Sequence, residues 1–183
     1  DATSEIAQNF SQQNQKVKVI RHEMNRGYGA ALRTGFEVSG KDYIFFTDGD
    51  NQFDITEISK LLPYVKDFDI VAGFRIKRQD NFIRKINEFC FNRFVRILFG
   101  LKIKDLNCAF KIYKRDVIKN LKLRSTWGFI NSELLIRAKK MGFTIKEVGV
   151  THYPRQWGTQ GGASLKVIIG SIYELFKLRK ELS

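Results

Sequence analysis

The sequence contains few of the residues that metal centres and nucleophilic enzymes most often use. Of its 183 residues, two are cysteines and two are histidines. Cys90 and Cys108 lie too far apart for a C-x-x-C motif and are too few for a disulfide framework, so we expect buried thiols in a reducing compartment. With so little histidine, a His-based metal site or a Ser-His-Asp triad has little support.

Long apolar runs are also missing. No uninterrupted apolar stretch approaches the ~20 residues that a spanning helix needs, and the first residues do not resemble a signal peptide. There are no internal repeats, low-complexity segments or obvious linkers. The 43% hydrophobic content is enough for one domain with a proper core. We therefore expect a single domain over residues 1–183, soluble or bound to a surface, and facing the cytoplasm.

Basic residues are in excess. Lys and Arg number 32 against 19 Asp and Glu, which gives a formal net charge of +13. This charge indicates anionic partners: nucleic acid, acidic lipid or a phosphorylated substrate. Composition alone does not choose among them.

The most informative stretch is Tyr43–Asp54 (YIFFTDGDNQFD), where a short apolar strand runs directly into acidic and amide side chains. Ligands of open α/β sheets gather at the carboxyl ends of strands. If the chain stays extended, Asp48, Asp50 and Gln52 turn to one side and form an all-oxygen set suited to Mg²⁺ or Mn²⁺ rather than zinc. The alternative is a plain turn, because the same residue types favour turns.

A second glycine-rich motif lies upstream at Asn25–Gly35 (NRGYGAALRTG), where a turn leads into a helix. Free backbone N–H groups at a helix N-terminus bind phosphate well, and glycine lets a ligand approach. The spacing does not fit G-x-G-x-x-G, because Leu32 stands where the third glycine should be. A dinucleotide fold is thus disfavoured, and a tight turn and a ligand loop both remain open.

Two helices are expected to be amphipathic and basic, over residues 82–101 and 164–182. Apolar residues recur at helical spacing in both, and Lys and Arg surround or follow them. Such helices suit a membrane interface, where the apolar face enters the headgroup region and the cations meet acidic lipid. Packing of the same faces on the sheet is the competing interpretation. The additional apolar residues Phe91, Ile97 and Phe99 favour the membrane.

The remaining segments alternate between helical and strand patterns, which is typical of an α/β protein. We predict helices over 1–13, 55–65, 116–121 and 127–137, and strands over 17–21, 69–74 and 145–150. Residues 105–113 are expected to lead from a polar turn into a further strand. Asn131 or Ser132 is a possible cap of the 127–137 helix. Glu133 near the start of this helix is either a catalytic or binding carboxylate or a residue that favours the helix dipole. Arg155 lies in a Gly-rich loop and could close on a diphosphate.

Together, five motifs resemble those of the family 2 glycosyltransferases of GT-A fold, and within them the polyprenyl-phosphate sugar transferases such as dolichyl-phosphate mannose synthase. The motifs are NRGYGAALRTG at 25–35, TDGDNQ at 47–52, VAGFR at 71–75, NCAFK at 107–111 and YPRQWGTQGGAS at 153–164. They occur in family order and span nearly the whole chain. The resemblance implies an α/β fold with a mostly parallel sheet flanked by helices.

The resemblance also implies roles for individual residues. Asp48, Asp50 and Gln52 would hold Mg²⁺ or Mn²⁺ against the diphosphate of a UDP- or GDP-hexose, and Arg155 would steady that diphosphate. Arg75 and Arg84 would receive the phosphate of a polyprenyl acceptor. Further substrate contacts are expected from Asn25, Arg26, Gly27, Gly29, Asp48 and Ser164, and catalytic roles from Asp50, Arg155 and Glu133.

This reading implies inverting transfer of a hexose at the cytoplasmic face of a membrane, by a peripheral protein or one anchored in a longer chain. A lipid phosphate is already anionic, so it needs no general base, and inversion at the anomeric carbon follows. A polysaccharide or protein acceptor would need a base, for which Glu133 is the one candidate. A nucleic-acid-binding module rests on charge alone, since no known motif appears, and we expect no nucleic acid partner.

The resemblance is incomplete before Asp1. A strand, helix and strand that normally clasp the base and ribose are missing, so the chain is expected to be N-terminally truncated. The resemblance therefore leaves open whether the chain is active by itself, as well as its oligomeric state.

Overall fold

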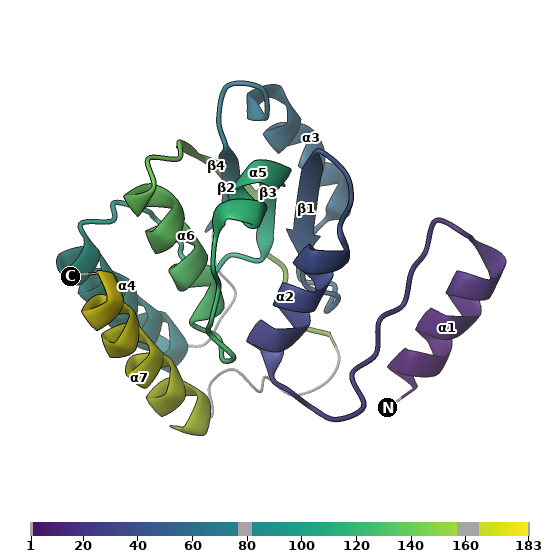
Figure 1. The fold of residues 1–183 in the computed structure, drawn as a ribbon, viewed down its shortest axis with the longest axis horizontal. Coiled ribbons are helices and arrows are strands. Elements are labelled where there is room, and N and C mark those ends of the chain that lie inside the picture. Colours follow the sequence, from purple (N-terminus) through teal and green to yellow (C-terminus); the bar gives the residue numbers. More distant parts are fainter. Residues whose placement is uncertain (1, 77–81, 157–164, 183) are drawn as a thin grey trace.

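The computed structural model describes residues 2–76, 82–156 and 165–182. Four strands form one sheet, in the order β1-β3-β2-β4. They are β1 (Tyr43–Thr47), β2 (Ile70–Ile76), β3 (Phe110–Lys114) and β4 (Ile145–Thr151). Most of the helices lie to one side of this sheet, and a short helical stretch covers the other (Figure 1). The predicted α/β class is confirmed.

The predicted sheet direction needs correction. Strand β2 pairs with β4 in parallel, but β3 runs antiparallel to both β1 and β2. The sheet is therefore mixed rather than mostly parallel. Because β3 lies between two strands that run the same way, the carboxyl ends of β1, β2 and β4 meet at one edge of the sheet, together with the first residues of β3.

Alternation along the strands creates two cores. Ile70 and Ala72 of β2 face a large cluster built with the helices α2 (Tyr28–Val38), α4 (Phe82–Phe99), α5 (Arg115–Asn120), α6 (Ile130–Lys140) and α7 (Leu165–Leu182). Val71 faces the opposite side, where Phe110 and Leu61 lie. That side is covered by the 3-10 turns Ile55–Glu57 and Leu62–Tyr64 and by α3 (Ile58–Leu61) between them. The helix expected over 55–65 is thus broken into three short pieces.

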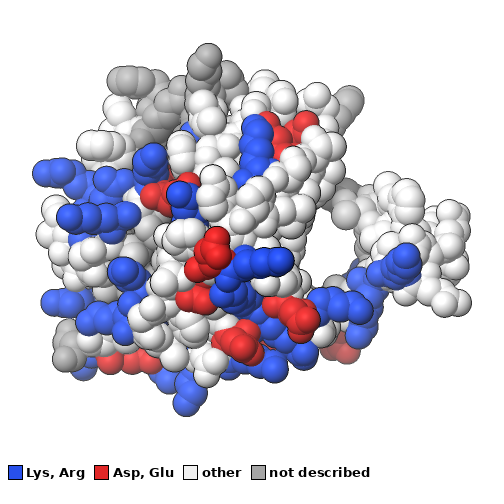
Figure 2. All heavy atoms as spheres, turned by 90° about the horizontal axis from the view of Figure 1, so that it is seen from above, with Lys and Arg blue, Asp and Glu red and all other residues white. Residues whose placement is uncertain are grey.

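The N-terminal segment lies apart from this body. Helix α1 (Thr3–Gln13) has no buried residue, and its apolar side chains Ile6 and Phe10 are exposed. Open space separates it from the sheet in both views (Figures 1 and 2). The strand predicted over 17–21 does not form. Its sequence favours a strand, but among the described residues no strand pairs with it.

Two smaller expectations also fail. Phe129, not Asn131 or Ser132, precedes the first residue of α6, and no side chain caps that helix. Of the two cysteines, Cys108 is buried as expected, but Cys90 is exposed.

Lys and Arg dominate part of the surface. Figure 2 shows them gathered on the side of the molecule away from α1, where Figure 1 places α4, α6 and α7. Among the described residues, no helix is both long and apolar enough to span a bilayer.

Candidate active site at the carboxyl edge of the sheet

Five elements bring polar side chains to the edge where β1, β2 and β4 end. Asp48 and Asp50 follow β1, and Arg155 follows β4. Helix α2 begins there with Tyr28, β3 begins next to Lys111, and Asn131 lies in the first turn of α6. This is the location at which ligands bind in open α/β sheets.

Asp50 forms an ion pair with Arg155. The Nη2 atom of Arg155 donates to Oδ2 of Asp50 at 2.6 Å. The side chain of Arg155 is 27% exposed and that of Asp50 is 18% exposed. The Nε atom of Arg155 is buried and has no hydrogen-bond partner among the described residues. The guanidinium therefore retains a donor beyond its contact with Asp50.

Asp48 lies beside this pair. The hydroxyl of Tyr28 donates to Oδ1 of Asp48 at 3.1 Å and accepts from Nδ2 of Asn131 at 3.3 Å. Burial raises the pKa of Asp48 above the ordinary carboxyl range, and the charge of Asp50 adds to this effect. The Tyr28 hydrogen bond and the positive charges of Lys111 and Arg155 oppose it. Burial, with the charge of Asp48, also raises the pKa of Tyr28.

The segment between Asp48 and Gln52 is not extended as predicted. It bends, and Asn51 adopts a left-handed φ of 59°. As a result, the three predicted ligands take different partners. Gln52 is buried and its Nε2 donates to the carbonyl of Tyr153 at 3.1 Å, while the backbone N–H of Tyr153 donates back to the Gln52 carbonyl at 2.9 Å. Gln52 thus ties the β1 turn to the Arg155 loop.

Asp48 and Asp50 fit a divalent cation by their chemistry. They are neighbouring carboxylates, and their mutual repulsion contributes to the raised pKa of Asp48. A hard cation would offset that repulsion and accept oxygen ligands of this kind. The role of Gln52 as a third ligand stays a prediction.

Lys111 is a site residue that the sequence analysis did not single out. Its side chain is fully buried, and its Nζ donates to the carbonyls of Leu106 (3.3 Å) and Cys108. Burial lowers its pKa, and its charge acts on Asp48. The signal was present as a lysine between the apolar residues Phe110 and Ile112 of β3. Tyr28 and Asn131 were likewise missed as site residues, because their meeting depends on the packing of two helices.

Two glycines of the 25–35 motif, Gly27 and Gly29, are explained by packing within the chain. A Cβ on Gly29 would lie 2.4 Å from the carbonyl oxygen of Ser125, and one on Gly27 would lie 2.6 Å from that of Thr126. Gly27 also has a φ of 88°, and its N–H donates to Oδ1 of Asn25 at 2.9 Å. Arg26 is exposed. The motif is therefore a close contact between α2 and residues 125–126 that presents Tyr28 to Asp48.

Glu133 is buried and occupied by structural contacts. It accepts hydrogen bonds from the backbone N–H groups of Arg124 and Ser125 at 2.8–3.1 Å and from Nε of Arg137 at 2.8 Å. It lies 2% exposed. This arrangement makes Glu133 an anchor of the 124–125 loop and gives no support to its predicted role in catalysis.

Arg75 is also already paired. Its guanidinium binds both oxygens of Asp105 at 2.7 and 2.8 Å and Glu88 of α4 at 2.6 Å. With 6% side-chain exposure, it joins β2 to α4. Its predicted contact with an acceptor phosphate stays a prediction that this pairing does not favour. Arg84 lies in α4 with its side chain outside the described part, and Ser164 lies outside the described residues altogether.

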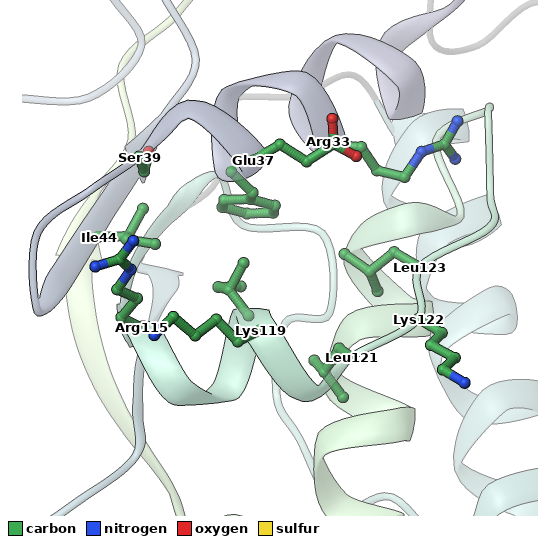
Figure 3. Close-up of a pocket in the computed structure, with 11 residues that line it drawn as sticks. Arg33, Glu37, Ser39, Ile44, Arg115, Lys119, Leu121, Lys122 and Leu123 are labelled. Carbon is green, nitrogen blue, oxygen red and sulfur yellow. The ribbon is translucent and has the colours of Figure 1, made fainter.

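A separate pocket of about 410 Å³ lies between α2 and α5 (Figure 3). Its lining includes Ile44, near the start of β1, whereas Asp48 follows the end of that strand. No predicted site residue lines it, so this pocket is not part of the candidate active site.

Comparison with known proteins agrees with the geometry. The sequence model of the family described as Glycosyl transferase family 2 matches residues 1–122. Dodecaprenyl-phosphate galacturonate synthase of Rhizobium johnstonii is 27% identical over 172 residues, which are 89% of this chain and 50% of that protein. Dolichyl-phosphate hexose transferase of Haloferax volcanii is 26% identical over 174 residues, 90% of this chain and 73% of that protein.

A solved structure confirms the GT-A fold. Glucosyl-3-phosphoglycerate synthase from Mycobacterium tuberculosis, crystallised with Mn²⁺ and UDP-glucose, superposes with a TM-score of 0.66 at 16% identity. The match covers 96% of this chain and 64% of that chain. The chain thus spans half the length of the first relative and less than two thirds of this structure.

Proposed function

The chain belongs to glycosyl transferase family 2, and we propose that it transfers a hexose from a UDP- or GDP-hexose to a polyprenyl phosphate, with inversion at the anomeric carbon. The observation that carries this proposal is the cluster of Asp48, Asp50 and Arg155 at the carboxyl edge of the sheet. Relatives named for transfer to dodecaprenyl and dolichyl phosphates support the acceptor class.

The donor diphosphate is proposed to bind over this cluster. Asp48 and Asp50 would hold Mg²⁺ or Mn²⁺, which supplies positive charge to offset the charge of the departing diphosphate. Arg155 can turn its guanidinium from Asp50 toward the same phosphates, and its Nε, which bonds to none of the described residues, provides a further donor. Charge that develops on the leaving group is then stabilised by groups already in place.

The acceptor is proposed to be an anion before it binds. Glu133 is the carboxylate that the sequence analysis offered as a base, and its oxygens accept hydrogen bonds from two backbone N–H groups and from Arg137. A hydroxyl acceptor would need a free base within reach. A phosphate oxygen attacks without one, and attack opposite the leaving diphosphate inverts the anomeric carbon. Arg84 remains the proposed cation for this phosphate.

The protein is further proposed to act at a membrane surface, through the predicted interface helices 82–101 and 164–182. Phe89 and Ile97 of α4 are 67% and 70% exposed, and Ile169 and Phe176 of α7 are 59% and 52% exposed. The rings of Phe94 and Phe176 lie 6.0 Å apart and join the two helices into one apolar face.

Charge selects an anionic lipid surface as the occupant of this α4–α7 face. On α4, Arg93 lies one helical turn from both Phe89 and Ile97. On α7, Lys180 follows Phe176 by four residues, and Lys177 is also exposed. Apolar side chains flanked by cations suit the headgroup boundary of acidic lipid. This supports the proposed location, and the cytoplasmic leaflet is the anionic one.

Transfer assays test the proposal. Labelled UDP-glucose or GDP-mannose is incubated with the protein, Mg²⁺ or Mn²⁺, and vesicles that contain a polyprenyl phosphate. We expect label in the organic-extractable lipid, dependent on the metal. Label in a polysaccharide, or in free sugar only, would reject the proposed acceptor.

A further inference from the structure

We propose that Glu174 on α7 is a positioning residue that couples binding of an anionic lipid surface to binding of a nucleoside diphosphate. The inference rests on the proposed function, because it connects the α4–α7 face with the Asp48–Asp50 cluster. It assigns a role to a side chain that contacts neither lipid nor substrate.

Residues 124–128 form the connection between these two regions. Glu174 accepts hydrogen bonds from the backbone N–H of Thr126 at 2.7 Å and from its hydroxyl at 3.1 Å. A second contact supports the first, because Gly170 lies so close to Trp127 that a Cβ would fall 2.9 Å from the indole ring. Helix α7 therefore holds residues 126–127 by a carboxylate and by a close backbone approach.

The same residues hold the start of α2 on their other side. The backbone N–H of Gly29 donates to the carbonyl of Thr126 at 2.9 Å, and Arg33 donates to the carbonyl of Ser125. Tyr28, between Gly27 and Gly29, bonds to Asp48 at 3.1 Å. A displacement of residues 124–126 therefore moves the hydroxyl that contacts Asp48.

Glu174 is placed for this role and not for packing alone. Its Oε2 atom is buried and has no hydrogen-bond partner among the described residues. A half-satisfied buried carboxylate is costly, and an apolar side chain would serve packing better. On the helix, Glu174 lies away from the exposed side that carries Ile169 and Phe176, so it does not meet the lipid.

A lipid surface favours the arrangement in which α7 is packed beside α4, for a geometric reason. A flat surface contacts both helices of the α4–α7 face only while α7 lies beside α4, where Phe94 meets Phe176. Lipid therefore binds more tightly when α7 is packed beside α4 than when it is displaced. In this packed arrangement, α7 also holds residues 124–126 against α2. A ligand shifts an equilibrium by its difference in affinity for the two states, and coupling between two ligands is reciprocal.

The test measures nucleoside diphosphate affinity with and without vesicles. Calorimetric titration of the parent protein measures this affinity without any change in the 153–164 motif. UDP and GDP are titrated with Mg²⁺ in the presence of phosphatidylcholine vesicles, with or without phosphatidylglycerol. We expect anionic vesicles to lower the Kd of the nucleotide by about fivefold or more. The nucleotide should strengthen vesicle binding by the same factor.

Variants assign the coupling to Glu174. Glu174→Ala should remove it while vesicle binding itself persists, and Glu174→Gln should leave an intermediate value, because an amide oxygen can still accept from Thr126. Asp67→Ala, which removes an exposed carboxylate outside both α4 and α7, is the matched control and should retain the coupling. If Glu174→Ala does not fold, the Gln variant carries the assignment.

The outcomes separate this inference from the proposed function. Binding of both ligands with no mutual effect in the parent protein would overturn the coupling and leave the proposed function intact. Full coupling in both Glu174 variants would overturn the role of Glu174. Failure of either the nucleotides or the anionic vesicles to bind would overturn the proposed function and this inference together.

Discussion

Among single residues, Asp50 is central to the proposed binding of metal and diphosphate, and it contacts Arg155 at 2.6 Å. Asp50→Asn keeps the shape of the side chain but removes the charge that both Arg155 and a divalent cation would use. We expect Mg²⁺-dependent binding of the nucleoside diphosphate to fall at least tenfold, which is about 1.4 kcal/mol. Calorimetric titration of UDP or GDP measures this. Asp67→Asn, an exposed change elsewhere, should have no effect, and an unchanged metal dependence in Asp50→Asn would remove Asp50 from the site.

Glycine 29 provides a second residue-scale prediction. In Gly29→Ala, the new Cβ meets the backbone of Ser125 at 2.4 Å, so residues 125–126 and α2 must separate. Overpacking of this kind costs about 1–3 kcal/mol of unfolding free energy. The matched control is Gly35→Ala in the same helix, where nothing lies within 4 Å and the change should stabilise by about 0.5–1 kcal/mol. Equal effects of the two changes in urea denaturation would contradict the packing explanation.

Asp69 gives a prediction about pH. Its carboxylate accepts from the backbone N–H and hydroxyl of Thr144 at 2.9 and 2.8 Å and pairs with Lys114 at 3.1 Å. These hydrogen bonds, that from the Thr144 backbone first, hold the pKa of Asp69 below its ordinary range. A lowered pKa in the folded state stabilises the fold at pH values above the unfolded pKa of about 3.9, and the stabilisation is lost as pH falls through the folded value.

Asp69→Asn should therefore lower the unfolding free energy by about 1–2 kcal/mol at pH 7. Below about pH 4, the difference from the parent protein should shrink as Asp69 takes up its proton. Urea denaturation at a series of pH values measures both. A difference that stays constant down to the acid range would show that the charge of Asp69 contributes nothing.

At the scale of elements, periodicity predicted most helices and three of the four strands well. Residues 70–76 and 145–151 form strands close to the predicted bounds, and the 82–101 helix ends within two residues of its prediction. Local pattern was sufficient here because apolar spacing and β-branched residues fix the element without help from elsewhere.

The predictions that were wrong concern features that depend on contacts between residues distant in sequence, which a local pattern does not contain. Residues 17–21 have strand propensity, but a strand also needs a partner, and β1 lies across open space from them (Figure 1). The reversed direction of β3 depends on the order of strands in space. The chain bends at Asn51, so that Asp48 bonds to Tyr28 and Gln52 bonds to Tyr153. Both partners are distant in sequence. Of the site, the sequence predicted Asp48, Asp50 and Arg155, but not Lys111 or Asn131.

Glu133 anchors the loop at residues 124–125, and its effect on stability separates a structural role from a catalytic one. Glu133→Gln breaks a buried network with two backbone N–H groups and Arg137, so we expect a loss of about 3–5 kcal/mol of unfolding free energy. Thermal denaturation measures the loss. Glu37→Gln, an exposed change on α2, should be neutral. A Glu133→Gln protein of normal stability that loses turnover would instead identify Glu133 as a base.

For the molecule as a whole, we propose that the net charge of +13 and the exposed α4–α7 face both contribute to binding of an anionic membrane. Ile97→Glu places a carboxylate on that face, where the parent side chain is 70% exposed. Loss of its apolar contact with lipid, about 1.5–3 kcal/mol, should weaken binding to anionic vesicles at least tenfold. Sedimentation with vesicles measures this.

Met24→Glu is the matched control for that prediction. Met24 is 72% exposed, but it lies in the segment before α2 and far along the chain from both interface helices. Met24→Glu makes the same change in net charge as Ile97→Glu and should weaken binding to anionic vesicles only slightly. Added salt should weaken binding of all variants, because surface charges are screened within about 10 Å at 0.1 M ionic strength. Equal losses in Ile97→Glu and Met24→Glu would assign binding to net charge and not to the face.

We propose that this molecule transfers a sugar to an acceptor that is already an anion. The most direct measurement compares polyprenyl phosphate with the corresponding polyprenol as acceptors, at equal vesicle concentration, and determines the anomeric configuration of the product by NMR. We predict a product from the phosphate alone, with configuration inverted relative to the donor. Comparable transfer to the polyprenol, or a product of retained configuration, would contradict the account.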